Sequence, residues 1–186
     1  MFDILQIILW SIAYLLIILA IFKNKDHKLI SIPYSAAILN FTWEINALIE
    51  SKGMWAHILW VSLDLLIIIY LIYTLNNKKK VIFILFIALN SILLNYLFTL
   101  TNGVLLSCFM IDLIMAIVFL VNYKNMSKTF KISIALCKML GDLFAWQYYK
   151  DNEIVNIIGV IVLIMNIIYF IKSFKDNKIL LEKIFG

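Results

Sequence analysis

The chain has 186 residues, 65% of them hydrophobic, and its mean hydropathy is +1.01. A composition this apolar excludes a soluble domain of this size and predicts an integral membrane protein. The formal net charge is +5, but the lysines are spread over loops rather than clustered on one element, which argues against a nucleic-acid-binding protein.

Hydropathy divides the chain into apolar segments, each close to the roughly 20 residues that a helix needs to cross a bilayer. Seven helices are predicted, over residues 3–22, 29–49, 56–75, 81–100, 103–122, 131–149 and 154–173. Because the connections are short, neighbouring helices should run antiparallel within a single transmembrane domain, residues 1–186. The apolar residues of the tail fit either an amphipathic surface helix or a frayed helix end.

The lysines indicate the orientation. Alternate loops and the tail carry them in groups, whereas the opposite side has only Lys52 and Lys150. By the positive-inside rule the grouped lysines are cytoplasmic, so the N-terminus lies outside and the C-terminus in the cytoplasm. The prediction is therefore an all-α, seven-helix, multi-pass protein of the cell membrane. All 16 basic residues are lysine, which hints at an AT-rich bacterial genome.

Five ionisable side chains lie inside the predicted spans, where a charge costs a few kcal/mol or more. They are Glu44, Asp64, Asp112, Lys138 and Asp142. The predicted spans place most of them in the outer half or near the midplane, so we expect one shared interior cavity. Because apolar surroundings favour the neutral form of a carboxyl, such a group can stay protonated near neutral pH and act as a general acid.

Helical spacing supports shared faces. Asn40 and Glu44 are four residues apart, so the amide can hydrogen-bond the carboxyl. Lys138 and Asp142 have the same spacing, and Trp146 continues their stripe. Each spacing places the polar groups of one span, the second or the sixth, on a common helix face.

Structural roles compete with functional ones for these residues. Lys138 and Asp142 can form an internal ion pair, Asp112 an interhelical hydrogen bond, and the asparagines interhelical contacts. Asp64 fits either role. Glu44 has no cation in its own helix and is the strongest functional candidate.

Two histidines and several tryptophans are expected at the membrane interfaces. His27 and His57 fall near predicted helix ends and should be solvated. Trp10, Trp55 and Trp60 fit an interfacial aromatic belt or simple packing.

Several stretches resemble the membrane-bound terpene cyclases of fungal meroterpenoid and indole-diterpene pathways, which are small seven-span proteins. Residues 34–44 (YSAAILNFTWE) and 60–64 (WVSLD) resemble that family's Trp-Glu pair in the second span and Asp in the third. Residues 137–142 (CKMLGD) are similar to its basic-x-Leu-Gly segment, and 165–169 (MNIIY) to a segment that usually reads Asp-x-x-Tyr. The resemblance covers roughly half the chain.

The family protonates a terminal epoxide or alkene of a prenylated substrate and guides the carbocation into rings. The resemblance implies that Glu44 is the acid or its proton-network partner, with Asp64 and Lys138 shaping the cavity.

One position departs from the family, because Asn166 replaces its acid in the last span and cannot deliver a proton. Either Asp142 or Asp112 takes that role, or the chain binds or isomerises a lipid without this cyclisation.

The predicted site has two parts. The predicted catalytic residues are Glu44, Asp64 and Asp142. The predicted substrate-binding residues, among them aromatics whose π faces can stabilise a cation, are Asn40, Trp43, Asp112, Lys138, Trp146, Asn166 and Tyr169. The expected partners are a hydrophobic or prenylated small molecule and membrane lipid. No metal, cofactor or nucleic acid is expected.

A second hypothesis is a small-molecule-binding or transport component, such as the substrate-capture subunit of a vitamin importer, or a lipid-capture protein. Such subunits usually have six spans and a small-residue docking motif, whereas this chain has seven predicted spans and 5 glycines. A receptor or sensor is a third hypothesis. A retinal protein is disfavoured because the last predicted span has no mid-membrane lysine. The sequence lacks HExxH, Walker and G-x-S-x-G motifs.

Overall fold

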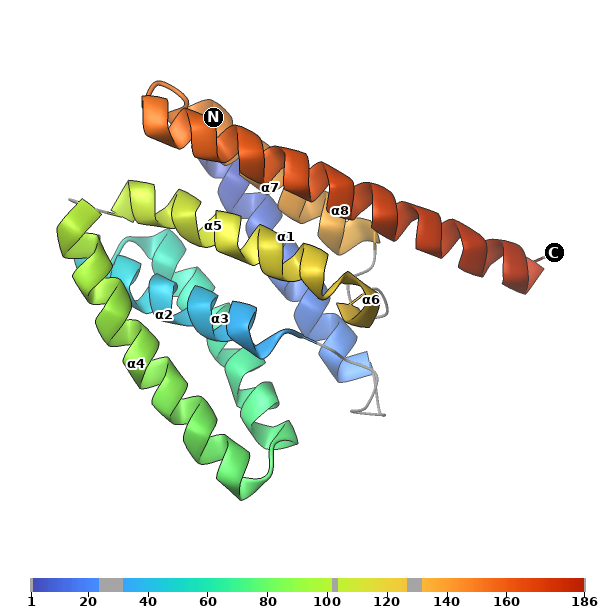
Figure 1. Ribbon diagram of the computed structural model, residues 1–186, viewed down its shortest axis with the longest axis horizontal. Coiled ribbons are helices and arrows are strands. Elements are labelled where there is room, and N and C mark those ends of the chain that lie inside the picture. Colours follow the sequence, from blue (N-terminus) through green and yellow to red (C-terminus); the bar gives the residue numbers. More distant parts are fainter. Residues whose placement is uncertain (1, 24–31, 102–103, 127–131, 186) are drawn as a thin grey trace.

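The structure is a computed structural model that describes residues 2–23, 32–101, 104–126 and 132–185, and within these ranges it is helical without strands. The helices are α1 (Phe2–Lys23), α2 (Tyr34–Glu50), α3 (Trp55–Thr74), α4 (Asn77–Thr101), α5 (Val104–Val121), α6 (Tyr123–Met126), α7 (Ile132–Tyr149) and α8 (Glu153–Phe185). The all-α prediction is confirmed, and each predicted span overlaps one long helix. In the tail, α8 continues without a break to Phe185, as Figure 1 shows.

Five helices in the described part of the chain are long and apolar enough to cross a membrane: α1, α3, α4, α5 and α8. The remaining long helices are α2 and α7. α2 has 17 residues, because Pro33 precedes it with an extended backbone (ψ 117°) and proline has no N–H to continue a helix. α7 carries Lys138 and Asp142. These two helices therefore bring much of the polar chemistry into the bundle.

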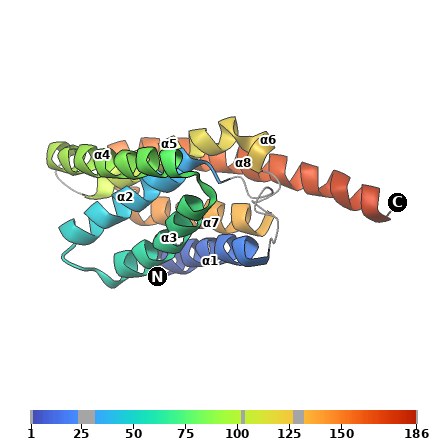
Figure 2. The ribbon, with the colours of Figure 1, turned by 90° about the horizontal axis from the view of Figure 1, so that it is seen from below.

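Six helices form a closed ring in which α1 packs on α7, α7 on α8, α8 on α5, α5 on α2, α2 on α3 and α3 on α1. α4 packs on α2 and α5 from outside the ring. Figure 2 shows α4, α5 and α8 in one layer and α1, α3 and α7 in another, with α2 between them. The interior of the ring is therefore bounded by helices that are distant in sequence.

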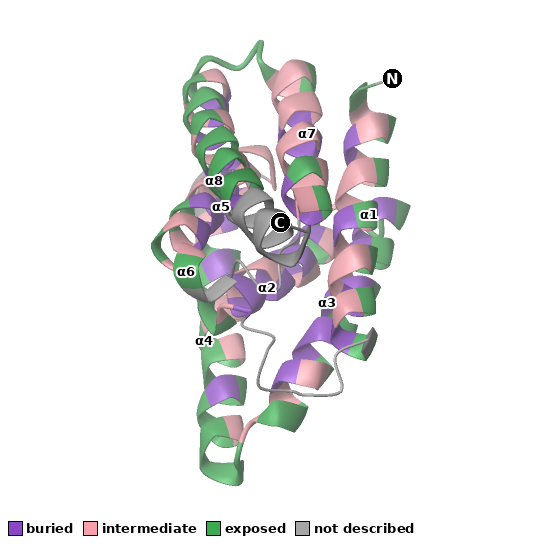
Figure 3. Ribbon diagram, turned by 90° about the vertical axis from the view of Figure 1, so that its right-hand side faces the viewer, coloured by how far each residue is buried: buried purple, intermediate pink, exposed green. Residues whose placement is uncertain are grey.

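The burial pattern is that of a membrane protein. Large apolar side chains are exposed along the outside, most of all on α4, where Leu85 is 62% and Ile92 68% exposed. Figure 3 shows these exposed residues on the outer faces and the buried ones turned inward. The buried polar groups include Glu44, Asp64 and Asp142. Apolar side chains thus cover the outside, as burial in lipid would require, and the buried carboxyls lie inside.

Two glycines let α7 and α8 approach their neighbours closely. A Cβ atom at Gly141 would collide with the Trp10 indole of α1, and one at Gly159 would lie 2.5 Å from Cδ1 of Trp146. Small residues at interhelical contacts are typical of membrane bundles. Gly141 thereby lets the Trp10 ring reach the carboxyl of Asp142, to which its Nε1 donates at 2.8 Å.

Candidate functional site

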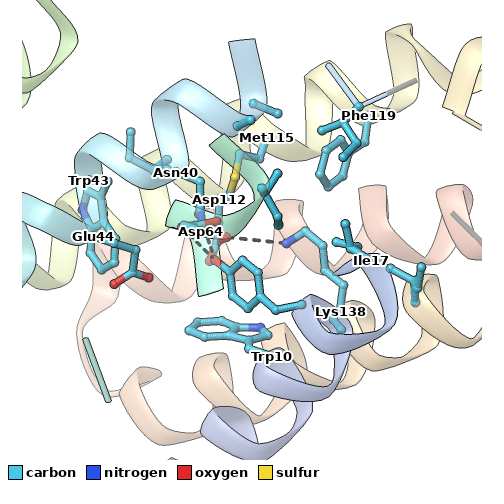
Figure 4. A pocket seen from close by; sticks show the side chains of 18 of the residues that line it. Trp10, Ile17, Asn40, Trp43, Glu44, Asp64, Asp112, Met115, Phe119 and Lys138 are labelled. Atoms are coloured by element: carbon cyan, nitrogen blue, oxygen red, sulfur yellow. Dashed lines mark hydrogen bonds and ion pairs between the residues drawn. The ribbon is translucent and has the colours of Figure 1, made fainter. Parts of the chain in front are cut away.

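The ring encloses a cavity of about 120 Å³ between α1, α2, α3, α5 and α7. At about 30 Å³ per molecule in the liquid, this volume corresponds to about four water molecules. Its polar and aromatic lining residues are Trp10, Tyr14, Asn40, Trp43, Glu44, Asp64, Asp112, Phe119 and Lys138. Figure 4 shows these side chains converging from separate helices.

The cavity is amphipathic along its length. One end is formed by apolar side chains, including Ile17 and Phe119, which come from the second halves of α1 and α5. The other end holds Glu44, and Asp64, Asp112 and Lys138 lie between the two ends (Figure 4). A molecule with a hydrocarbon part and a polar or reactive end matches this arrangement.

Glu44 and His57 form a buried pair. Nδ1 of His57 lies 2.7 Å from Oε2 of Glu44, and the two residues are 4% and 3% exposed. The His57 ring packs edge-on against Trp43 and Trp60, with centroids 5.6 Å and 5.5 Å away. The expectation of a solvated His57 is therefore wrong, because α3 turns its first residues toward α2. His27 lies outside the described residues.

Asp64 is held by neutral donors. Nδ2 of Asn40 donates to its Oδ2 at 2.7 Å, and the Tyr14 hydroxyl donates to the same oxygen at 3.4 Å. Asn40 also donates to the Tyr14 hydroxyl. The expected hydrogen bond from Asn40 to Glu44 is replaced by these contacts, because the facing helices bring Asp64 and Tyr14 within reach of the amide.

Lys138 is held between two carboxyls. Its Nζ lies 2.8 Å from Oδ2 of Asp142 and 3.5 Å from Oδ1 of Asp112, which confirms the expected ion pair within α7. Asp142 also accepts hydrogen bonds from Nδ2 of Asn166 at 2.5 Å and Nε1 of Trp10 at 2.8 Å. This cluster joins α1, α5, α7 and α8.

The expectation that the four buried carboxyls share one cavity is correct for Glu44, Asp64 and Asp112, which all line it. It is wrong for Asp142, which is not among the lining residues and which Lys138 separates from the others. Asn166 contacts the site only through Asp142.

Two predicted substrate-binding aromatics lie away from the cavity. Nε1 of Trp146 donates to Oδ1 of Asn156 at 2.8 Å, because the stripe that continues from Asp142 faces α8. Tyr169 is buried behind Phe119, with ring centroids 6.0 Å apart. Neither residue lines the cavity, and their substrate-binding role stays a prediction.

Sequence reasoning missed three residues of this site: Trp10, Tyr14 and His57. Helical spacing could have indicated two of them, because Trp10 and Tyr14 are four residues apart and share one face of α1. His57 likewise shares the face of α3 that carries Trp60 and Asp64, at spacings of three and seven.

Carboxyls outnumber cations in this interior. The four buried carboxyls are Glu44, Asp64, Asp112 and Asp142, whereas Lys138 is the one lysine paired with any of them in the described ranges. Because an uncompensated buried charge is very costly, the surplus carboxyls must carry protons, meet a cationic ligand or, for Glu44, pair with a protonated His57. Over the residues described, no group of three or more His, Cys, Asp or Glu side chains could hold a metal ion.

Comparison with known proteins finds no matching family model, no matching curated protein and no matching solved structure.

Proposed function

We propose that this chain is an intramembrane acid catalyst that protonates a prenylated or isoprenoid amphiphile and guides its cyclisation, in the manner of the membrane-bound terpene cyclases that it resembles. The observation that carries the proposal is the position of Glu44. Its carboxyl lines an amphipathic cavity, and its hydrogen-bond partner is an imidazole rather than a lysine.

A protonated Glu44 would act as the general acid. With no lysine beside it, the neutral acid form is the less costly state in so buried a place. The proton would pass to the terminal epoxide or alkene of the substrate, leaving a carboxylate on Glu44 and a carbocation in the cavity. The carboxylate left on Glu44 would accept the proton that the final cation loses and exchange it with solvent before the next turnover, while Asp64 would shape the same cavity.

The cavity walls suit a cationic intermediate. Trp10, Tyr14, Trp43 and Phe119 all line it, and aromatic faces stabilise a nearby cation by about 0.5–2 kcal/mol each. The apolar end around Ile17 would hold the isoprenoid chain. This arrangement supports a substrate lying along the cavity with its reacting end at Glu44.

In this proposal, Asp142 does not take the role of the acid that the family carries in its last span. That carboxyl is engaged by Lys138, Trp10 and Asn166 and does not line the cavity. In this proposal the Asp142 cluster fixes the positions of Trp10 and Lys138, while Glu44 alone delivers the proton.

The membrane setting completes the proposal. All seven long helices would cross the cell membrane, with the N-terminus outside, as the lysine distribution favours. The Glu44 end of the cavity would then lie toward the outer surface, because Glu44 is in the second half of the outward-running α2. The apolar end would lie toward the cytoplasmic leaflet.

The test compares two glutamates of α2, because Glu44 is buried and Glu50 is exposed. The purified protein in lipid nanodiscs is given a farnesylated hydroquinone with a terminal epoxide, and cyclised product is measured. Glu44→Gln should lower turnover by about 10²-fold or more, the usual contribution of a general acid. Glu50→Gln should leave it unchanged. Full activity in Glu44→Gln would reject Glu44 as the acid.

A second function is favoured by the carboxyl surplus, namely binding or transport of an organic cation. Glu44 and Asp64 face the cavity without a lysine partner, so an amine-bearing ligand would be neutralised there. In that case cationic amphiphiles such as long-chain amines would raise the unfolding temperature of the wild type, and Asp64→Asn would remove the effect. Neutral prenylated compounds would then have no effect.

A further inference from the structure

The buried imidazole of His57 has one hydrogen-bonding partner in the described part of the chain. Nδ1 lies 2.7 Å from Oε2 of Glu44, whereas no described hydrogen bond reaches Nε2. Trp43 and Trp60 pack edge-on against the ring and fix its plane. The ring is therefore held in place by two tryptophans and directed at one carboxyl oxygen.

The tautomer of a neutral imidazole at this distance decides which oxygen of Glu44 carries the acidic proton. If the ring proton were on Nε2, Nδ1 would accept the acidic proton of Glu44 at Oε2. With the ring proton on Nδ1, the ring donates to Oε2, and Oε1 is left to carry the proton of Glu44. An acid that delivers its proton into the cavity therefore requires the Nδ1–H tautomer.

We infer that His57 is a positioning residue for the acid: it donates its Nδ1–H to Oε2 of Glu44, so that the transferable proton of Glu44 resides on Oε1, the oxygen left for the cavity. This inference rests on the proposed function and adds the group that orients the acid. His57 itself does not line the cavity and does not touch the substrate.

The alternative tautomer would have the opposite consequence. A Glu44 proton on Oε2 would point at the imidazole and would be unavailable to a substrate. A proton transferred completely to His57 would leave a carboxylate, which cannot act as an acid. The position of this proton therefore separates a usable acid from an unusable one.

The first experiment reads the tautomer directly and needs no substrate. The chain has 2 histidines, so ¹⁵N-histidine labelling gives signals from His27 and His57 alone. His27→Gln removes one set and assigns the other. Solid-state NMR of the nanodisc-embedded protein near neutral pH should show His57 with its proton on Nδ1. An Nε2–H ring or a doubly protonated ring would overturn the inference.

The second experiment uses side chains that place an N–H differently. His57→Asn keeps a donor at the position of Nδ1, His57→Gln moves it to that of Nε2, and His57→Phe has none. With the farnesylated epoxide as substrate, the kcat of His57→Asn should stay within a few fold of the wild-type value. Gln and Phe should lose about 10-fold or more in kcat with KM little changed, as expected for a misaligned acid. Equal losses in all three variants would overturn the inference.

The two experiments also separate this inference from the proposed function. If the wild type turns over no prenylated probe, the proposed function fails while the NMR result still decides the tautomer. If the wild type is active but its His57 is protonated on Nε2, the positioning role fails and the proposed function stands.

Discussion

Replacing Lys138 with methionine should be one of the most destabilising single changes in this protein. Methionine keeps much of the apolar stem but removes the ammonium group, which lies 2.8 Å from Asp142 and 3.5 Å from Asp112. Both carboxyls are buried, so neither reaches the bulk solvent. The substitution therefore leaves two acidic groups without their shared cation.

Removing one partner of a buried ion pair lowers the free energy of unfolding by about 3–5 kcal/mol. We expect the loss in Lys138→Met to fall in this range. Asp142 keeps its hydrogen bonds from Trp10 to Oδ1 and from Asn166 to Oδ2. An asparagine at this position can keep the Trp10 bond with its amide oxygen, and its NH2 group can donate to the oxygen of Asn166 once that amide flips. Adding Asp142→Asn to Lys138→Met should therefore restore part of the loss. The resulting coupling free energy should be about 1–3 kcal/mol.

The measurement is reversible unfolding in mixed micelles with a rising fraction of a denaturing detergent. Lys150→Met is the matched control, because Lys150 is exposed and contacts Gln147 at the end of α7. It should change stability by less than about 0.5 kcal/mol. If Lys138→Met were no more destabilising than Lys150→Met, the lysine would not be holding the carboxyls and the charge argument for this interior would be wrong.

The other predictions concern packing and orientation. Gly141→Ala should destabilise the protein by about 1–3 kcal/mol despite its better helix propensity, because the new methyl group displaces Trp10, and it should also impair turnover of the prenylated probe. Gly159→Ala creates a similar collision away from the cavity, so in the same two assays it should lower stability and spare activity. For the orientation, a cysteine at Asn76 should be protected from an impermeant reagent in intact cells and one at Lys52 labelled, and the reverse pattern would invert the topology.

Local patterns predicted the elements of this fold. Hydropathy located the long helices because membrane helices must be apolar over a fixed length. The pair of Lys138 and Asp142 followed from a spacing of four residues, which is a property of one helix. The clustering of Glu44, Asp64 and Asp112 followed from the cost of exposing a carboxyl to lipid.

Contacts between helices were harder to predict, because no local pattern states which helices are neighbours. The partner of Glu44 is His57, on the next helix, and the partner of Asp142 includes Trp10, 132 positions earlier in the chain. Trp146 shares a stripe with Asp142 but faces α8, since the ring of helices places α7 between α1 and α8. Predicting these contacts requires knowing which helices pack against each other, and the spacing of residues within one helix does not give that.

The central claim is that a proton moves from a buried carboxyl onto a prenylated substrate. The most direct measurement is deuterium incorporation when the wild type, in D₂O, converts a farnesylated hydroquinone with an unmodified terminal alkene. Protonation of the alkene forms a C–D bond and the final cation loses a proton, so each cyclised product should carry one non-exchangeable deuterium, and Glu44→Gln should give no product. Cyclised product without deuterium, or equal product from Glu44→Gln, would contradict the account.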